Sequence, residues 1–133
     1  MSKTLMDRID GLEAAELVTL AGTDLSPGDD LDEAGYLLAM ETSDTIGLGT
    51  QNVWEQLKRE FHALICTDDA RYASLREQAG AFSQKNTTAF VSLVSAGVGA
   101  AIGLSAVALV PLVGLLLLAL VRIGKETFCH LPG

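Results

Sequence analysis

The chain has 133 residues, of which 49% are hydrophobic, 5% aromatic and 20% charged, and its formal net charge is -8. This length suits a single domain at most. The acidic balance argues against nucleic acid as a partner, because that affinity comes largely from Lys and Arg side chains that neutralise phosphates. Eleven acids face two bases in residues 1–50, five of each lie in residues 51–85, and one acid and two bases lie in residues 86–133.

This uneven charge predicts three parts. We expect an acidic, cytosolic helical head over residues 1–85, a hydrophobic membrane segment over residues 86–121 and a short cytosolic tail over residues 122–133. Acidic residues such as those in the first fifty positions usually form a solvated surface. Because nearly all of these charges are negative, a basic protein partner for the head remains an alternative.

The head begins with helical patterns. One amphipathic helix is expected over residues 2–22, followed by a loop over residues 23–30. A second, short helix is expected over Leu31–Met40, and the segment Thr42–Gly49 should end it. The apolar positions of the first helix are Leu5, Ile9, Leu12, Leu17 and Leu20.

The best-patterned helix of the head is predicted over Thr50–Cys66, with Thr50 as its cap. A further helix should follow the capping segment Thr67–Asp69 and lead towards the membrane segment. Aromatic residues at helical spacing are more often core than a partner-binding patch, so we assign them to the core of the head. They are Trp54, Phe61, Tyr72 and Phe82.

A run of thirty-six residues without an ionisable side chain, 86–121, is the most specific signal in the sequence. About 18 consecutive apolar residues already favour a transmembrane helix over the core helix of a soluble protein. We expect the run to enter a membrane, since a head of 85 residues should not cover both faces of so long an apolar rod.

The length of the run favours two crossings. One continuous helix of this length would measure ~54 Å, against a hydrocarbon core of ~30 Å. A hairpin of Thr88–Ile102 and Ser105–Val121, with its turn at Gly103, Leu104 and Ser105, divides the run into two short arms. A kink or fresh start is expected at Pro111, which lacks an amide donor. A turn at Ala108–Pro111 remains an alternative, as does a single span over Leu104–Val121.

Basic residues flank both ends of the run, with Arg76 and Lys85 before it and Arg122 and Lys125 after it. Since Lys and Arg accumulate on the cytoplasmic side of membrane segments, we expect a membrane protein whose two termini both face the cytoplasm.

Small residues recur every four positions on the first arm, at Ser95, Gly99 and Gly103. This arrangement lets two helix backbones approach closely in lipid. The face is therefore a candidate packing seam for a homo-oligomer.

The rest of the sequence offers little chemistry. Cys66 and Cys129 are far apart and no secretory leader is recognisable, so we expect two reduced, cytosolic thiols. A zinc site of His62, Cys66, Cys129 and His130 can be drawn, but its ligand spacing is irregular, and acylation of Cys129 is a weaker alternative. No catalytic motif can be assembled, so we expect neither an enzyme nor a cofactor.

No stretch alternates cleanly enough to predict a strand. The expected class is all-α, a small N-terminal helical bundle followed by a C-terminal hydrophobic transmembrane helical hairpin. The first functional hypothesis is a membrane-inserting effector whose hairpin oligomerises and permeabilises the bilayer, with the head as sensor or assembly domain. In general architecture it resembles small two-helix membrane effectors of bacterial toxin and defence systems, without sharing a diagnostic motif. The second hypothesis is a passive anchor whose acidic head recruits a soluble partner.

Overall fold

Eight α-helices and one short 3-10 helix form the regular structure of this computed structural model, which describes residues 3–25, 30–46, 50–81 and 86–130. None of the described residues lies in a strand, so the predicted all-α class is confirmed. In chain order the elements are α1 (Lys3–Asp10), α2 (Ala14–Ala21), α3 (Leu31–Ile46), α4 (Thr50–Cys66), the 3-10 helix η1 (Ala70–Tyr72), α5 (Ala73–Gly80), α6 (Thr87–Ile102), α7 (Ala106–Ile123) and α8 (Lys125–Cys129).

The single helix expected over residues 2–22 is wrong, because the chain forms α1 and α2 with a break at Gly11–Glu13. The amide of Gly11 still bonds back to Asp7, but Glu13 adopts an extended backbone and starts α2. The break lets the two halves pack on different partners. Helix α1 lies against α5, whereas α2 lies against α7 and α6, and one straight helix could not reach both groups.

Helix α3 continues to Ile46, so the expected end at Met40 is also wrong. The residues that follow Met40 are polar but include neither Gly nor Pro before Gly47, and such residues weaken a helix without stopping it. In contrast, α4 begins at Thr50 and ends at Cys66, as predicted.

Helices α3 and α4 meet around Trp54, which is completely buried. Its indole Nε1 donates a hydrogen bond to Asp32 Oδ1 at 2.9 Å, and Lys58 Nζ reaches the same oxygen at 2.6 Å. Partial burial raises the pKa of Asp32, but these bonds from Lys58 and Trp54 outweigh burial and hold that pKa below its usual value. Phe61 and Tyr72 are buried as well, which confirms their place in the core, while Phe82 lies outside the described residues.

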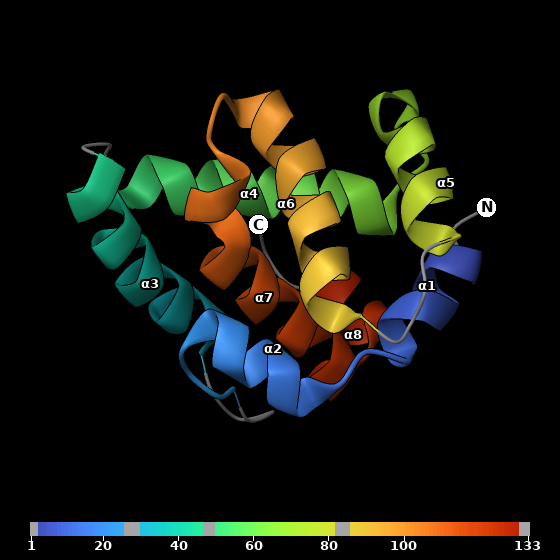
Figure 1. Cartoon of the computed structure of the whole chain (residues 1–133), viewed down its shortest axis with the longest axis horizontal. Helices are drawn as coiled ribbons and strands as arrows, with labels where there is room; N and C mark the ends of the chain where they lie inside the picture. The colour runs from blue at the N-terminus through green and yellow to red at the C-terminus, as the bar shows by residue number, and fades with distance from the viewer. Residues whose placement is uncertain (1–2, 26–29, 47–49, 82–85, 131–133) are drawn as a thin grey trace.

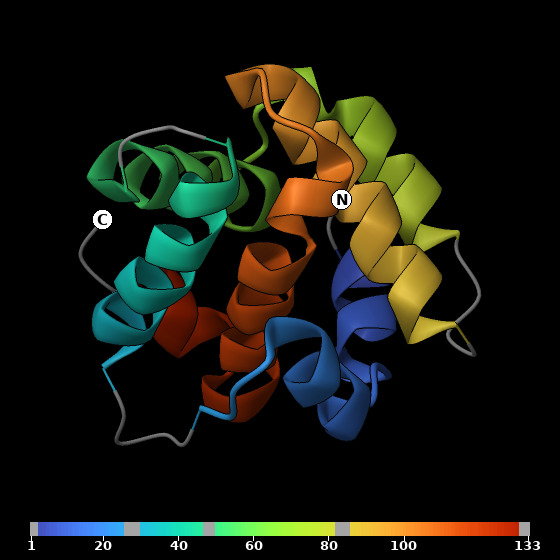
Figure 2. The same ribbon diagram turned by 60° about the vertical axis from the view of Figure 1, so that its left-hand side comes forward.

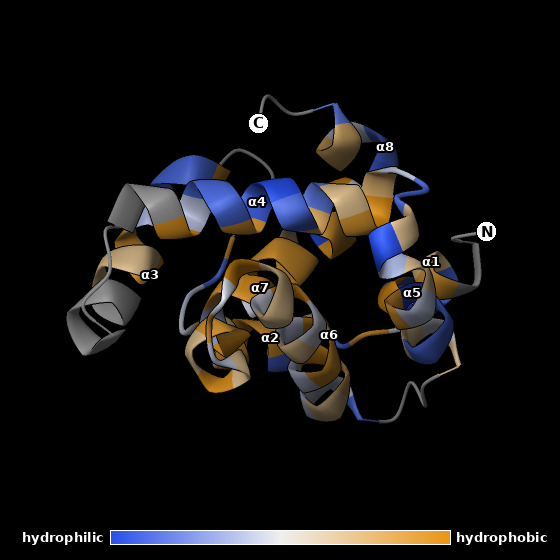
Figure 3. Ribbon diagram, turned by 90° about the horizontal axis from the view of Figure 1, so that it is seen from above, coloured by the Kyte–Doolittle hydropathy of each residue, from blue (hydrophilic) through white to orange (hydrophobic). Residues whose placement is uncertain are grey.

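Helix α7 runs through the centre of the molecule, with the other helices arranged around it (Figures 1 and 2). It contacts α1, α2, α3, α4, α6 and α8. Helix α4 crosses one side with its polar face outward and its apolar face towards α7 (Figure 3). The fold is thus one apolar helix surrounded by other helices that pack their apolar residues against it, although Leu37 and Met40 of α3 stay exposed.

Candidate functional site

Helices α6 and α7 form a helical hairpin whose turn lies where the sequence predicts it. Helix α6 ends at Ile102, and Gly103 follows with a φ of 79°, in the left-handed region that favours glycine. The amides of Gly103 and Leu104 both bond to the carbonyl of Gly99, at 2.8 and 2.9 Å. Ser105 then caps α7, since its side chain accepts a hydrogen bond from the amide of Val107.

Pro111 lies within α7, and the helix continues through it. The alternative turn at Ala108–Pro111 and a fresh helix start at Pro111 are therefore wrong. Proline in the second turn of a helix removes only one bond of the ladder, and the contacts of the surrounding helices hold the remainder.

Of the three small residues of the first arm, Gly99 lies against the turn and the second arm of the same chain. Ser95 is fully buried, and its hydroxyl has no hydrogen-bond partner among the described residues. A Cβ on Gly99 would lie 2.5 Å from the Leu104 carbonyl oxygen and 3.2 Å from Leu109 Cδ1. Gly99 thus allows the turn to close tightly. Gly103 is exposed in the turn itself.

The head and α6 together cover most of α7, contrary to the expectation that the apolar rod could not be enclosed. Every residue from Leu112 to Leu120 is buried. At Gly114 the backbones of α7 and α2 come close, because a Cβ there would lie 3.4 Å from the amide nitrogen of Ala21. Several helices of the head, packed around α7, together bury it, although a head of 85 residues seemed too small to do so.

Among the described residues, α7 is the one helix long and apolar enough to cross a membrane, and α6 is a shorter apolar helix. In the structure 56% of the apolar stretch of α7 is buried. The core helix of a soluble protein can have the same length and composition, so α7 by itself does not decide between the two environments.

The solvent-facing positions of the hairpin differ in composition from those of an ordinary pair of surface helices. Five of the sixteen residues of helix α6 are exposed, and they are Thr88, Ser92, Ala96, Ala100 and Ala101. The turn exposes Gly103 and Ser105, and Val107 at the start of α7 is 82% exposed. Surface helices of soluble proteins normally carry charged residues on the solvent side. Here every exposed position of the hairpin from residue 86 to residue 121 is uncharged, including the turn at the top of Figure 1, and the first charge is Arg122 in the last turn of α7.

The basic residues expected to flank the membrane segment lie in different surroundings. Arg122 pairs with Asp24, with 3.0 Å between Nη2 and Oδ1. Lys125 begins α8, directly after α7 and Gly124. Lys85 lies outside the described residues.

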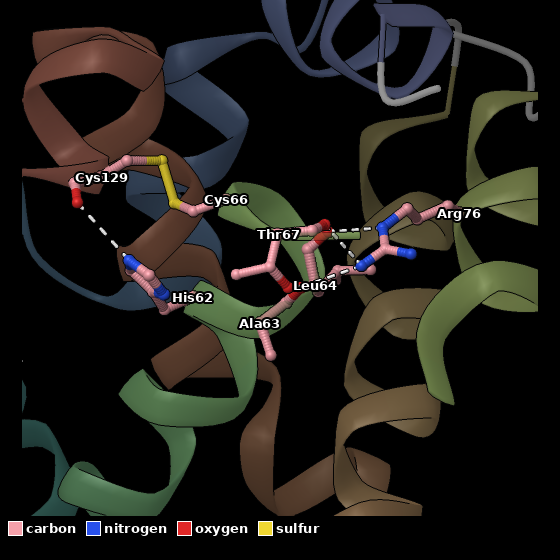
Figure 4. The surroundings of a disulfide bond; sticks show 7 residues. All are labelled: His62, Ala63, Leu64, Cys66, Thr67, Arg76 and Cys129. Carbon is pink, nitrogen blue, oxygen red and sulfur yellow. Dashed lines mark hydrogen bonds between the residues drawn. A yellow bond between two sulfur atoms is a disulfide. The ribbon is translucent and has the colours of Figure 1, made fainter. Parts of the chain in front are cut away.

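A disulfide joins Cys66, at the end of α4, to Cys129, at the end of α8 (Figure 4). The expectation of two reduced thiols is therefore wrong. The sequence separation of 63 residues hid the pair, because only the return of the chain after α7 brings α8 to α4. The zinc alternative is not supported either, as both sulfurs are bonded to each other and no group of three metal-ligating residues lies in the described parts of the chain.

Two further contacts hold α8 beside α4. His62 Nε2 lies 3.4 Å from the carbonyl oxygen of Cys129 (Figure 4). Phe128 packs edge-on against Phe61, with 5.7 Å between ring centroids. The tail thus folds back on the head, as the zinc alternative required, but for a different chemical reason.

Arg76 caps the end of α4 and does not flank a membrane segment. It is 9% exposed, and its guanidinium donates to the carbonyls of Ala63, Leu64, Thr67 and Asp69 at 2.7 to 2.9 Å. Figure 4 shows three of these acceptors gathered on one side of the guanidinium. The last carbonyls of a helix lack internal partners, and a cation there also suits the helix dipole. Sequence gives no signal for this role, since the acceptors are main-chain atoms.

No family model matches the chain, and no curated protein or solved structure does so either. Function is therefore inferred from the residues of this chain alone.

Proposed function

We propose that the protein is a membrane-inserting, non-enzymatic effector whose α6–α7 hairpin is sheltered by the head in the structure described here. On release, the hairpin enters the bilayer, associates with other copies and makes the membrane leak. The head serves as the shelter and as the assembly domain.

The uncharged exposed surface of the hairpin between residues 86 and 121 is the observation that carries this proposal. Burial inside the head explains why α7 is apolar, but it does not explain why the exposed positions of α6 avoid charge. A charged residue at the centre of a membrane helix costs about 2.5–3.5 kcal/mol of insertion free energy, whereas Ala, Ser and Thr are tolerated. A bilayer requires that α6 carry no charge, and α6 carries none. The soluble fold does not require this at the exposed positions of α6.

The hairpin geometry also suits entry with the turn first. The turn carries small and apolar residues, and Val107 stands 82% exposed beside it. Both ends of the hairpin would then stay on the side of entry, next to Arg122 in the last turn of α7 and Lys125 after it. Gly99 packs on the turn and on Leu109 of the same hairpin, so in lipid this face would become available to a second copy where the two arms separate.

Release of a trapped dye from lipid vesicles tests the proposal. Ala96→Asp places a charge at an exposed position near the middle of α6, where the soluble fold tolerates it. Gln56→Asp is the matched control, at an exposed position near the middle of α4. With all three proteins reduced and equally folded in solution, we expect wild type and Gln56→Asp to release dye and Ala96→Asp to fail. Equal release by Ala96→Asp, or no release by any of them, would refute the proposal.

The anchor hypothesis remains as a second proposal, in which the acidic first half of the chain binds a basic protein. Its support is the excess of eleven acids over two bases in residues 1–50. Vesicle binding that depends on Ala96 but releases no dye would favour the anchor.

Oligomer formation is tested by the concentration dependence of release, which rises faster than linearly if several copies act together.

A further inference from the structure

The Cys66–Cys129 disulfide encloses the hairpin in a covalent loop. The 63-residue separation between the two cysteines contains η1, α5, α6 and α7, so the whole hairpin lies between the bonded sulfurs. Cys129 lies only six positions after Ile123 at the end of α7. Six residues span at most ~20 Å, so the bond keeps the end of α7 within that distance of the end of α4.

The two sides of this bond are held very differently. On the α4 side, Arg76 ties down the segment around Cys66 through hydrogen bonds to four carbonyls. On the other side, α8 has five residues, no side chain of the described residues caps its start, and one long contact from His62 reaches it. Apart from the disulfide, the packing of Phe128 on Phe61 is its principal attachment. A helix of five residues is unstable unless other parts of the protein hold it.

We propose that this disulfide is a redox latch on the hairpin, which when oxidised keeps α7 in the head and when reduced frees α8 and the end of α7. The latch would regulate the proposed membrane function. Its effect on membranes rests on that function, whereas the release of α7 does not. The fixed part is α4 with Arg76, and the part that moves is α8 with the end of α7.

Opening the latch is a thiol–disulfide exchange with a dithiol reductant. A thiolate of the reductant attacks one sulfur of the Cys66–Cys129 bond, forms a mixed disulfide and releases the other cysteine as a thiolate, which takes up a proton. The second thiol of the reductant then displaces the first cysteine. The protein gains two electrons and two protons, and the dithiol becomes a disulfide. Both cysteines are half-buried, so a small reductant can reach the bond.

Amide hydrogen exchange of the full chain, with and without dithiothreitol, tests the latch without any membrane. We expect reduction to accelerate exchange in α8 and in the last two turns of α7 at least tenfold more than it accelerates exchange in α4. The Cys66→Ser/Cys129→Ser variant should exchange like the reduced protein and ignore dithiothreitol. Equal protection of α7 in both redox states would overturn the proposal. So would a uniform acceleration that includes α4, because the bond would then be a general staple of the fold.

Vesicle leakage separates the latch from the proposed function. We expect the reduced protein to release trapped dye at least tenfold faster than the oxidised protein, and the serine variant to match the reduced form. If reduction loosens α7 but no vesicle leaks, the latch stands and the membrane function is wrong. If oxidised and reduced protein leak vesicles equally, the function stands and the latch is wrong.

Discussion

Gly35→Ala is expected to destabilise the protein, although alanine is the better helix former. Gly35 lies in α3, and a Cβ there would lie 2.2 to 2.4 Å from Cε2, Cζ2 and Cη2 of Trp54. Real Cβ atoms do not come so close to other atoms, so either the ring or the helix must shift. The ring has little room to move, because Trp54 is fully buried and its Nε1 is bonded to Asp32.

The size of the effect follows from two opposing contributions. Overpacking a full core costs up to about 3 kcal/mol, whereas Gly→Ala inside a helix stabilises by about 1 kcal/mol, so the net loss should be about 2 kcal/mol. For a chain of this length that loss lowers Tm by about 7 °C.

Removal of the indole of Trp54 should turn the destabilising effect of Gly35→Ala into a stabilising one. Trp54→Ala alone is expected to cost about 3–5 kcal/mol, as for other buried aromatics. In that background the added methyl of Gly35→Ala meets no ring, so it should stabilise by about 1 kcal/mol, which gives a coupling of about 3 kcal/mol between the two sites. Urea denaturation followed by far-UV circular dichroism measures all four proteins, since Trp54 is the one tryptophan and its fluorescence is lost.

Gly114→Ala is the matched control, because Gly114 is also buried in mid-helix but its Cβ would meet neighbours only at ordinary distances of 3.4 Å or more. It should leave stability unchanged or raise it. If Gly35→Ala is as stable as the parent, or destabilises equally with and without Trp54, the close contact of α3 with the indole is wrong.

Three further predictions concern the ends of α4. Reduction, or Cys66→Ser/Cys129→Ser, should lower the free energy of unfolding by about 4 kcal/mol, the value expected for a closed loop of this size, and urea titrations of both redox forms measure it. Arg76→Met should cost about 3 kcal/mol in the same assay, because four carbonyls lose a charged donor, and a loss below about 1 kcal/mol would contradict the capping role. Because the pKa of Asp32 is lowered on folding, its contribution is fully present above its usual pKa of 3.8 and disappears as pH falls through the lower folded value. Thermal melts at falling pH should therefore show a smaller acid loss for Asp32→Asn than for wild type.

Local signals were predictable from the sequence, and long-range partners were not. Thr50 and the apolar stripe after it predict the bounds of α4, and Gly103 predicts the hairpin turn, because caps and glycines act through their immediate neighbours. The break at Gly11 depends on which helices α1 and α2 face, and that information is absent from their own residues.

The burial of α7 was mispredicted for a related reason. Its composition is equally suited to lipid and to a protein core, and only the sum of six contacting helices decides that it is covered. The same return of the chain brings Cys129 to Cys66 and so makes the disulfide. The candidate hairpin could thus be located from sequence, but its shelter and its covalent bond could not.

The covalent loop also determines how the chain responds to mechanical force. If the two ends of the 133-residue chain are pulled apart, the load passes across the Cys66–Cys129 bond and bypasses the residues between the two cysteines. The oxidised chain can then extend to only about 240 Å, whereas the reduced chain can reach about 450 Å. Helices α5, α6 and α7 carry no tension until the sulfurs separate. In an optical trap, adding a reductant to a stretched molecule would appear as a sudden lengthening of about 210 Å, a direct count of the residues stored behind one bond.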